Sequence, residues 1–265
     1  MKVVFVGAGP GAPDLITVRG RDFLSRADIV IYAGSLVNPE LLAYAPEAAE
    51  IYNSAPMDLD EVTAVYLRNR EAGGIIVRLH TGDPSLYGAV QEQIDFCKDA
   101  EIPFEVVPGV SSFFAAAAAL GQEFTLPGVS QSLILTRLAG RTPVPDSEDL
   151  AELARHRTSM AVFLSAGNLD GVVEKLKTGY PEDTPAAVVY RASWPDQKIV
   201  TGNLADIAGK CAEAGITRQA LVLVGNVLEA GMGSGSYEKS KLYDPGFSHG
   251  YRAGRSYDGG EDGGV

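Results

Sequence analysis

Residues 2–14 have the sequence KVVFVGAGPGAPD, in which an apolar, β-branched run ends in a turn that contains three glycines. Such a run bounded by glycine is typical of a buried strand. Similar runs occur at residues 28–32 (DIVIY), 74–79 (GIIVRL) and 104–108 (FEVVP). Segments with helical periodicity lie between them, at residues 14–26, 58–72 and 87–99. This alternation predicts a mainly parallel sheet with helices on both faces.

A second series of elements begins near residue 130. Strands are predicted at 132–136, 159–164, 186–191, 197–202 and 219–225, and helices at 147–155, 168–177 and 203–213. The strands at 186–191 and 197–202 are too close in sequence for a helical crossover, so they should be antiparallel neighbours. The second half is therefore expected to hold a mixed sheet.

The turn-rich stretch FTLPGVSQ between the two series suits a domain boundary. We therefore predict an α/β protein of two α/β domains. The predicted divisions are an N-terminal domain over residues 1–123, a C-terminal domain over 124–233, a C-terminal segment over 234–254 and a disordered tail over 255–265. The tail assignment follows from its frequent glycines and its scarcity of aliphatic residues.

Composition excludes several classes of protein. The 265 residues are 46% hydrophobic and carry a formal net charge of −12, which disfavours a nucleic-acid or anionic-membrane binder. The apolar run at residues 113–120 is too short to span a membrane. Two isolated cysteines and three scattered histidines form no disulfide framework and no metal-ligand pattern. A cytoplasmic protein without a metal site is the expectation.

The first glycine turn allows more than one interpretation. Gly7, Gly9 and Ala12 match the dinucleotide fingerprint G-x-G-x-x-G/A. However, two prolines remove N–H donors from this turn, and no acidic residue follows the strand at 28–32 to bind a ribose. The turn is therefore an ordinary strand–helix connection, a nicotinamide site or a site for another ligand.

Two more turns follow predicted strands. Thr81-Gly82-Asp83-Pro84 comes after the third strand, and Pro108-Gly109 precedes Ser111-Ser112 after the fourth. Asp83 either caps the next helix or faces a ligand. Because parallel strands end at one edge of a sheet, and open α/β sheets bind ligands there, the three turns together favour a binding site.

These motifs resemble a known family. Gly9-Pro10-Gly11, Gly82-Asp83-Pro84 with Tyr87-Gly88, Pro108-Gly109-Val110-Ser111-Ser112 and Thr136-Arg137 are similar, in this order, to the signature of the tetrapyrrole (corrin/porphyrin) methylases. The resemblance covers about residues 1–230. It implies an S-adenosylmethionine-dependent homodimeric methyltransferase that releases S-adenosylhomocysteine, with the cofactor bound in a cleft between the two domains. Residues 32–37 and 242–252 are similar to the branch that methylates precorrin-4 at ring carbon 11 in cobalamin biosynthesis.

The resemblance also implies which residues form the site. The cofactor contacts that it implies are Pro10, Thr81, Gly82, Asp83, Leu86, Ser111, Ser112, Leu164, Ala192 and Ala220. The polycarboxylate tetrapyrrole would be bound by Arg137, Tyr87 and Arg191, although each arginine could equally be an ordinary surface residue. His80 either takes part in proton transfer or forms a polar wall, and no catalytic base is assigned.

Three other functions remain open from the sequence. The first is a methylase that acts at another position of the corrin precursor. The second is a nicotinamide-dependent oxidoreductase, and the third is a module that binds S-adenosylmethionine without methyl transfer. No nucleic-acid or membrane partner is expected.

Overall fold

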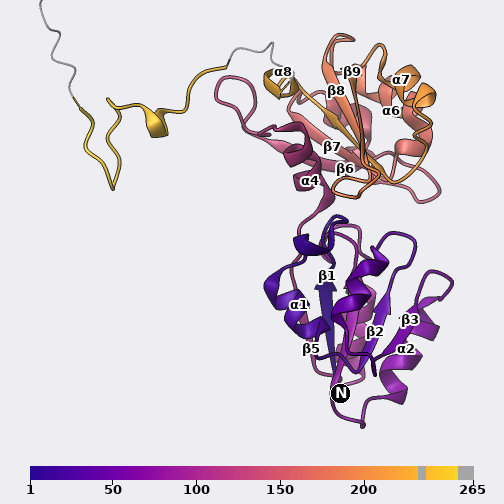
Figure 1. Cartoon of the computed structure of the whole chain (residues 1–265). Coiled ribbons are helices and arrows are strands. Elements are labelled where there is room, and N and C mark those ends of the chain that lie inside the picture. The colour runs from indigo at the N-terminus through magenta and orange to yellow at the C-terminus, as the bar shows by residue number, and fades with distance from the viewer. Residues whose placement is uncertain (232–236, 256–265) are drawn as a thin grey trace, which may run out of the picture.

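The computed structural model describes residues 1–231 and 237–255, which form two sheets in succession along the chain (Figure 1). The first sheet contains β1 (Lys2–Gly7), β2 (Ile29–Tyr32), β3 (Glu50–Asn53), β4 (Ile75–His80) and β5 (Phe104–Val107). Its strand order is β3-β2-β4-β1-β5, and every pairing is parallel. The carboxyl ends of β4, β1 and β5, which carry the glycine turns, therefore lie next to one another.

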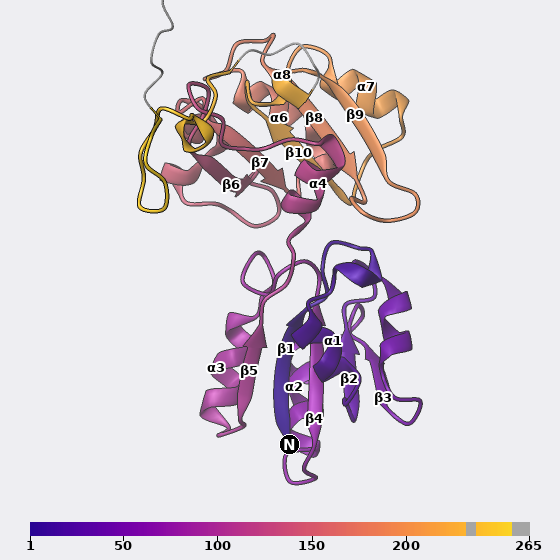
Figure 2. The same ribbon diagram turned by 60° about the vertical axis from the view of Figure 1, so that its left-hand side comes forward.

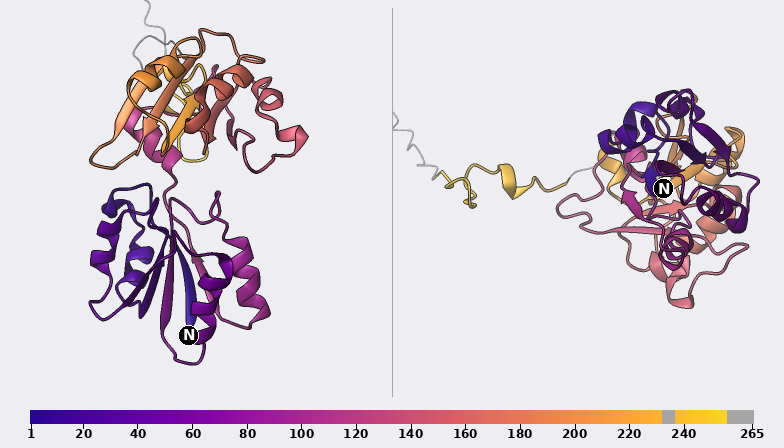
Figure 3. Two further views of the ribbon diagram at one scale, coloured as in Figure 1. Left: turned by 90° about the vertical axis from the view of Figure 1, so that its right-hand side faces the viewer. Right: turned by 90° about the horizontal axis from the view of Figure 1, so that it is seen from below.

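Helices cover both faces of the first sheet (Figure 3, left). They are α1 (Val18–Leu24), α2 (Leu59–Arg68) and α3 (Gln91–Asp99), with 3-10 turns at η1 (Pro13–Leu15) and η2 (Pro39–Tyr44). Val4 and Val6 of β1 pack in one core with Leu24 of α1, whereas Val3 and Phe5 pack in another with residues of α2 and α3. This alternation puts successive side chains on opposite faces, as a strand requires.

The second sheet is mixed, as predicted. It contains β6 (Leu133–Arg137), β7 (Ser159–Phe163), β8 (Pro185–Tyr190), β9 (Lys198–Asn203) and β10 (Ala220–Val224). Its order is β6-β7-β10-β8-β9, with β6 parallel to β7 and the other pairings antiparallel. Its helices include α5 (Leu150–Ala154), α6 (Leu169–Leu176), α7 (Ile207–Glu213) and α8 (Leu228–Gly231). The predicted α/β class and the antiparallel pair β8–β9 are thus confirmed.

Helix α4 (Ser112–Leu120) follows the first sheet but packs on the second. Phe113 and Ala116 belong to one core cluster with Ala161 of β7 and Leu221 and Leu223 of β10. Figure 2 shows the chain leaving β5 and entering α4 beside the second sheet. We call β1–β5 with α1–α3 the first unit, and β6–β10 with α4–α8 the second. The domain boundary at residue 123 stays a prediction.

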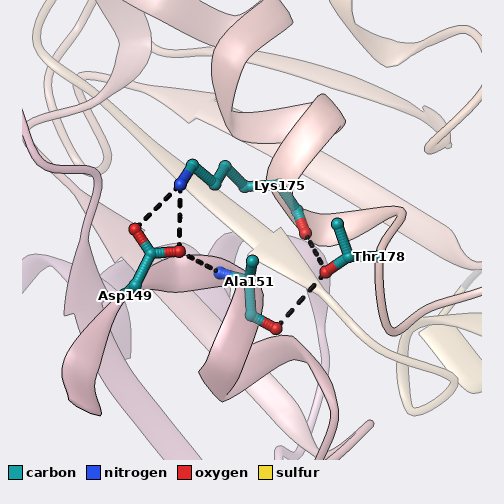
Figure 4. A network of polar contacts seen from close by, with 4 residues as sticks. All are labelled: Asp149, Ala151, Lys175 and Thr178. Carbon is teal, nitrogen blue, oxygen red and sulfur yellow. Dashed lines mark hydrogen bonds and ion pairs between the residues drawn. The ribbon is translucent and has the colours of Figure 1, made fainter. Parts of the chain in front are cut away.

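A polar network joins two helices of the second unit (Figure 4). The Asp149 carboxylate accepts the Ala151 N–H at 2.9 Å and contacts Lys175 Nζ at 2.8 Å. The Thr178 hydroxyl donates to the carbonyl of Lys175 at 2.8 Å. The hydrogen bond from Lys175 lowers the pKa of Asp149. These contacts cap α5 and tie it to α6, so their role is structural.

Residues 237–255 form a C-terminal arm that extends away from both sheets (Figures 1 and 3). The arm meets the second unit where the Glu238 N–H donates to Pro127 O at 3.3 Å. Within the arm, which includes η5 (Lys241–Tyr243), the Arg252 guanidinium donates to Leu242 O at 2.8 Å and Asp244 O at 2.7 Å. It therefore has local order of its own. Except for Arg255, the predicted disordered tail 255–265 lies outside the described residues, as do residues 234–236 of the predicted C-terminal segment.

Candidate functional site

The first two glycine turns are joined backbone to backbone. Gly9 and Gly82 form an isolated antiparallel bridge, with the Gly82 N–H donating to Gly9 O at 2.8 Å and the Gly9 N–H donating to Gly82 O at 3.2 Å. Gly9 and Gly82 both have positive φ, of 77° and 61°, a conformation that glycine adopts without steric cost. The two turns therefore form one continuous surface at the edge of the sheet.

Asp83 ties the second turn to the third. Its Oδ2 accepts the Gly109 N–H at 2.8 Å, and its Oδ1 accepts the N–H of Ser85, also at 2.8 Å, and the Ser85 hydroxyl. Burial raises the pKa of this carboxyl, but the hydrogen bonds from Ser85 and Gly109 outweigh it and leave the pKa below its usual value. Both carboxylate oxygens are thus occupied by the protein, and Asp83 is an ionised link between turns.

Glycine is needed at Gly109 because three backbone segments meet there. A Cβ on Gly109 would lie 2.1 Å from Gly82 O and 2.7 Å from Gly7 Cα. Those neighbours are backbone atoms, which cannot rotate away. The close approach explains why the third turn needs a glycine even though its φ is not positive.

Helix α4 begins beside the three glycine turns, and its first residues carry hydroxyl groups that are not used in hydrogen bonds within the described chain. Neither Ser111, its N-cap, nor Ser112 makes a side-chain hydrogen bond within the described chain. Ser111 is only 7% exposed, and a Cβ on Gly82 would lie 3.8 Å from its Oγ. Because the first amides of a helix also lack intrahelical partners, this end of α4 can bind an anionic or hydroxylated group.

The second unit meets this edge through three loops. Leu164 follows β7 with φ of 52° and is 71% exposed. Ala192 is buried in the loop after β8, and Ala220 is the first residue of β10. From the first unit, Leu86 packs against the second unit's core. The ten residues implied as cofactor contacts thus lie on turns, at strand ends or at the start of α4, near the junction of the two units, although their contact with a cofactor stays a prediction.

The three residues implied for the substrate have other contacts. Tyr87 lies with its ring 5.3 Å from that of Phe163, across the junction. The Arg137 guanidinium donates to the carbonyls of Leu138, Thr142 and Pro143 at 3.4, 3.1 and 2.7 Å. Arg191 pairs with Asp196. Both arginines are therefore ordered by the protein itself, and whether they bind substrate stays a prediction.

Sequence reasoning missed the residues that join the two units. Trp194 Nε1 donates to Pro10 O at 3.1 Å, the Ala12 N–H donates to Ser193 Oγ at 3.0 Å, and Gln219 Nε2 donates to Ser35 O at 2.8 Å. Each contact connects residues more than 180 positions apart, and no local pattern encodes such a distance. The one available signal was that Trp194 is the single tryptophan of the chain.

Metal and membrane sites are not found among the residues that the structure describes. Residues 1–231 and 237–255 contain no group of three or more His, Cys, Asp or Glu side chains arranged to hold a metal ion. No helix in these ranges has the length and apolarity needed to cross a membrane. Cys97 and Cys211 are both buried and unpaired, as spectator thiols would be.

Comparison with known proteins decides the family. The sequence profile of the Tetrapyrrole (Corrin/Porphyrin) Methylases matches residues 2–208. The chain belongs to this family of tetrapyrrole methylases. A cobalt-precorrin-4 C(11)-methyltransferase of Methanocaldococcus jannaschii is 53% identical over 95% of this chain and 96% of its own length. A precorrin-4 C(11)-methyltransferase of Sinorhizobium sp is 48% identical over 95% of this chain and 98% of its own.

Solved structures agree with this assignment. A cobalt precorrin-4 methyltransferase has a TM-score of 0.84 at 46% identity, covering 86% of this chain and 95% of its own. The uroporphyrin-III C-methyl transferase from Thermus thermophilus, complexed with S-adenyl homocysteine, has a TM-score of 0.74 at 29% identity, covering 87% of this chain and all of its own. The predicted family, fold class, enzyme class and S-adenosylmethionine cofactor are thus confirmed, and the nicotinamide alternative is set aside.

The residues of this methylase fit such a cofactor. The hydroxyls of Thr81, Ser111 and Ser112 form no hydrogen bond within the described chain, so they are available to a ligand. The glycine turns expose backbone without side chains, which suits close approach of a nucleoside. The exposed Leu164 side chain adds apolar surface from the second unit.

The surroundings of His80 favour its neutral form near neutral pH. Burial, followed by the positive charge of Arg78, lowers the pKa of His80 from its ordinary 6.5 to about 3, although the backbone of Gly88 favours the charged ring. The residue is 5% exposed, and its Nε2 has no hydrogen-bond partner among the residues that the structure describes. Of the two sequence interpretations, the neutral wall residue therefore fits the structure.

The depressed pKa of His80 predicts an acid sensitivity. Between pH 6.5 and pH 3 the unfolded chain binds a proton at His80 that the native protein excludes, so stability falls as the pH falls. At about 1.4 kcal/mol per pKa unit, His80 alone should cost about 3 kcal/mol between pH 7 and pH 4. Urea denaturation of wild type and His80→Gln measures this, because the variant should lose less stability over that interval. Equal losses would contradict the prediction.

Proposed function

We propose that this methylase transfers a methyl group from S-adenosylmethionine to carbon 11 of precorrin-4 or cobalt-precorrin-4 in cobalamin biosynthesis. The observation that carries this proposal is the match to relatives named for this reaction, at 53% and 48% identity over 95% of the chain. Matches of that length include the C-terminal arm as well as both sheets. A methylase acting at another ring position is the alternative that the test below must separate.

The chain's own residues align and enclose the reactants. When bound, S-adenosylmethionine supplies an electrophilic methyl group on its sulfonium. Ser111, Ser112 and the amides of α4 would hold the carboxylate of the cofactor, while Pro10 and the Thr81–Asp83 turn would border it. The opposite wall of the site would consist of apolar side chains that exclude water. These are Leu86 of the first unit and Leu164, Ala192 and Ala220 of the second. Alignment of this kind contributes roughly 7–11 kcal/mol to lowering a barrier, so no nucleophilic side chain is required.

A thermal-shift experiment tests the cofactor part of the proposal. S-adenosylhomocysteine at a hundredfold excess over its Kd should stabilise the protein by about 2.7 kcal/mol and raise the unfolding midpoint. NAD should leave the midpoint unchanged. Stabilisation by NAD but not by S-adenosylhomocysteine would overturn the proposal.

We propose that Arg137 contributes to tetrapyrrole binding in two ways: it holds the loop of residues 138–143 in place, and it donates hydrogen bonds to a substrate carboxylate. Its Nη1 and Nη2 atoms donate to three carbonyls of residues 138–143, so within residues 1–231 and 237–255 the Nε–H and one Nη2 hydrogen have no partner and can serve a substrate carboxylate. Guanidinium geometry suits both tasks, and an ammonium group could not reproduce it. Tyr87 and Arg191 would complete the substrate side.

Loss of Arg137 should therefore affect the two ligands unequally. For Arg137→Ala we expect KM for the tetrapyrrole to rise by at least about tenfold, equivalent to about 1.4 kcal/mol. The Kd of S-adenosylhomocysteine should change less than threefold, and Arg137→Lys should rescue only part of the loss. Steady-state kinetics and calorimetric titration give both numbers. An equal loss for both ligands would contradict the assignment.

The enzyme is further proposed to be a homodimer in which the C-terminal arm contacts the second copy. Leu242, Tyr243, Phe247 and Tyr251 of the arm are 53%, 81%, 41% and 101% exposed. The arm carries four Lys and Arg against two Asp and Glu, whereas the whole chain has a net charge of −12. Exposed aromatic residues on a basic segment suit an acidic partner surface such as a second copy. The two free cysteines support the predicted cytoplasmic location.

Removal of the arm should weaken this dimer. A chain that ends at residue 231 should dissociate with a Kd at least about tenfold higher than wild type, because the apolar contacts of the arm are lost. Analytical ultracentrifugation over a concentration series measures the constant. A matched control that lacks only residues 256–265 keeps the arm and should behave as wild type. Unchanged association of the shorter chain would refute the role of the arm.

A further inference from the structure

The loop between β8 and β9 reaches across the junction and holds the first glycine turn. Trp194 Nε1 donates to Pro10 O at 3.1 Å, and Ser193 Oγ accepts the Ala12 N–H at 3.0 Å. Two neighbouring side chains of the second unit thus bind two backbone groups of one turn in the first unit. Both contacts lie beside Pro10 and Ala192, which are proposed above as cofactor contacts.

The Trp194 indole also explains why residue 11 is a glycine. A Cβ on Gly11 would lie 2.1 Å from Trp194 Cδ1 and 2.2 Å from Trp194 Nε1. The φ of Gly11 is not positive, so its conformation does not demand glycine. Close approach is therefore the reason, and the group that approaches is the protein's own indole rather than a bound ligand.

The loop is braced so that the indole stays in place. The Arg191 guanidinium lies 3.9 Å from the centroid of the Trp194 ring and is paired with Asp196. The backbone N–H of Trp194 donates to Arg191 O at 3.0 Å, and the backbone N–H of Ser193 donates to Gln197 Oε1 at 2.7 Å. Arg191 and Ser193 both have positive φ, of 46° and 69°. Strained non-glycine residues persist when surrounding contacts fix them, and they concentrate at functional sites.

We propose that Trp194 is a positioning residue that sets the first glycine turn against the second unit and so fixes the width of the cofactor site. The proposal rests on the proposed function only in taking Pro10 and Ala192 as cofactor contacts. Without the indole, the Pro10–Ala12 turn loses a hydrogen bond and its packing partner, and the two halves of the site separate. Cofactor affinity should fall while the bound complex still reacts.

A double-mutant cycle between Gly11 and Trp194 tests the contact. In the wild-type background, Gly11→Ala places its methyl group against the indole and should raise the Kd of S-adenosylhomocysteine at least tenfold. In the Trp194→Ala background the space is empty, so adding Gly11→Ala should change that Kd less than twofold. Equal effects of Gly11→Ala in both backgrounds would overturn the proposal.

Two further measurements separate positioning from general destabilisation. Trp194→Phe keeps a ring but removes the N–H, and it should raise KM for S-adenosylmethionine about threefold to tenfold while kcat changes less than threefold. The emission of the single tryptophan should shift when S-adenosylhomocysteine binds to the wild type. A fall in kcat with unchanged KM, or unchanged emission, would contradict the role.

The same cycle distinguishes failure of the Trp194 proposal from failure of the proposed methyltransferase function. Unfolding midpoints measured without ligand should show the same coupling, with Gly11→Ala lowering the midpoint in wild type but not in Trp194→Ala. If the wild type did not bind S-adenosylhomocysteine, the proposed function would fail while this coupling still tested the contact. Additive midpoint changes would refute the contact itself.

Discussion

Replacing Gly109 by alanine is expected to abolish binding of S-adenosylhomocysteine and to lower the free energy of unfolding by about 3 kcal/mol. The added methyl group would lie 2.1 Å from Gly82 O and 2.7 Å from Gly7 Cα, so two other turns would have to move. Overpacking usually costs about 1–3 kcal/mol, and the upper end applies where only backbone can yield. Urea denaturation and calorimetric titration measure the two effects.

Gly209→Ala is the matched control for this substitution. Gly209 is exposed in α7, and a Cβ there would meet nothing within 4 Å. Because alanine favours a helix over glycine by up to about 1 kcal/mol, this variant should be as stable as wild type or more so. It should also bind S-adenosylhomocysteine normally. Tight binding by Gly109→Ala would show that the three turns do not need their close approach.

The second large effect is expected for Asp83→Asn. The carboxylate accepts from Gly109 on one oxygen and from Ser85 on the other, and an amide can keep only one of these interactions. Leaving a part-buried N–H unsatisfied costs about 1–3 kcal/mol. The third turn and the start of α4 would then shift, and the Kd of S-adenosylhomocysteine should rise by at least about tenfold, equivalent to about 1.4 kcal/mol.

Asp95→Asn serves as the control for Asp83→Asn. The Asp95 carboxylate lies on the surface of α3, where it contacts Lys98 and Gln91 of the same helix. Its loss should change neither stability nor ligand affinity measurably.

The pKa of Asp83 is lowered, so its stabilising effect is present above its unfolded pKa and disappears as the pH falls through the lower folded value. Wild-type affinity in Asp83→Asn would contradict the linking role.

Much of the fold could be predicted because its strands carry strong local patterns. The apolar runs that become β1 and β4 correctly predicted a parallel sheet. The strand β3, with sequence EIYN, was missed because this short edge strand has no apolar run. The predicted helix at 87–99 begins instead at Gln91, since Tyr87 and Ala89 adopt positive φ. The placement of α4 on the second sheet depends on tertiary packing, which periodicity does not encode.

The part of the candidate site that the glycine turns of the first unit form could be predicted better than the contacts that the second unit adds. The sequence placed the glycine turns together at one edge of the first sheet, and the structure brings them into contact there, because positive φ and close approach both select glycine. That this edge binds the cofactor stays a prediction. The partner of Asp83 and the charge state of His80 could not be deduced, since each depends on groups brought close by folding. The role of Trp194 could not be predicted for the same reason, because its contact residues Pro10 and Gly11 lie in the other unit.

The most direct test of the central claim is turnover with S-adenosylmethionine carrying a ¹³C-labelled methyl group. The purified full-length protein would be supplied with precorrin-4 and, separately, with cobalt-precorrin-4, and NMR would locate the new methyl group. We predict a ¹³C-methyl group on carbon 11 of one of these substrates, with release of one S-adenosylhomocysteine per methyl transferred. A labelled methyl group at another carbon, or no transfer by protein that binds S-adenosylhomocysteine, would contradict the proposed function.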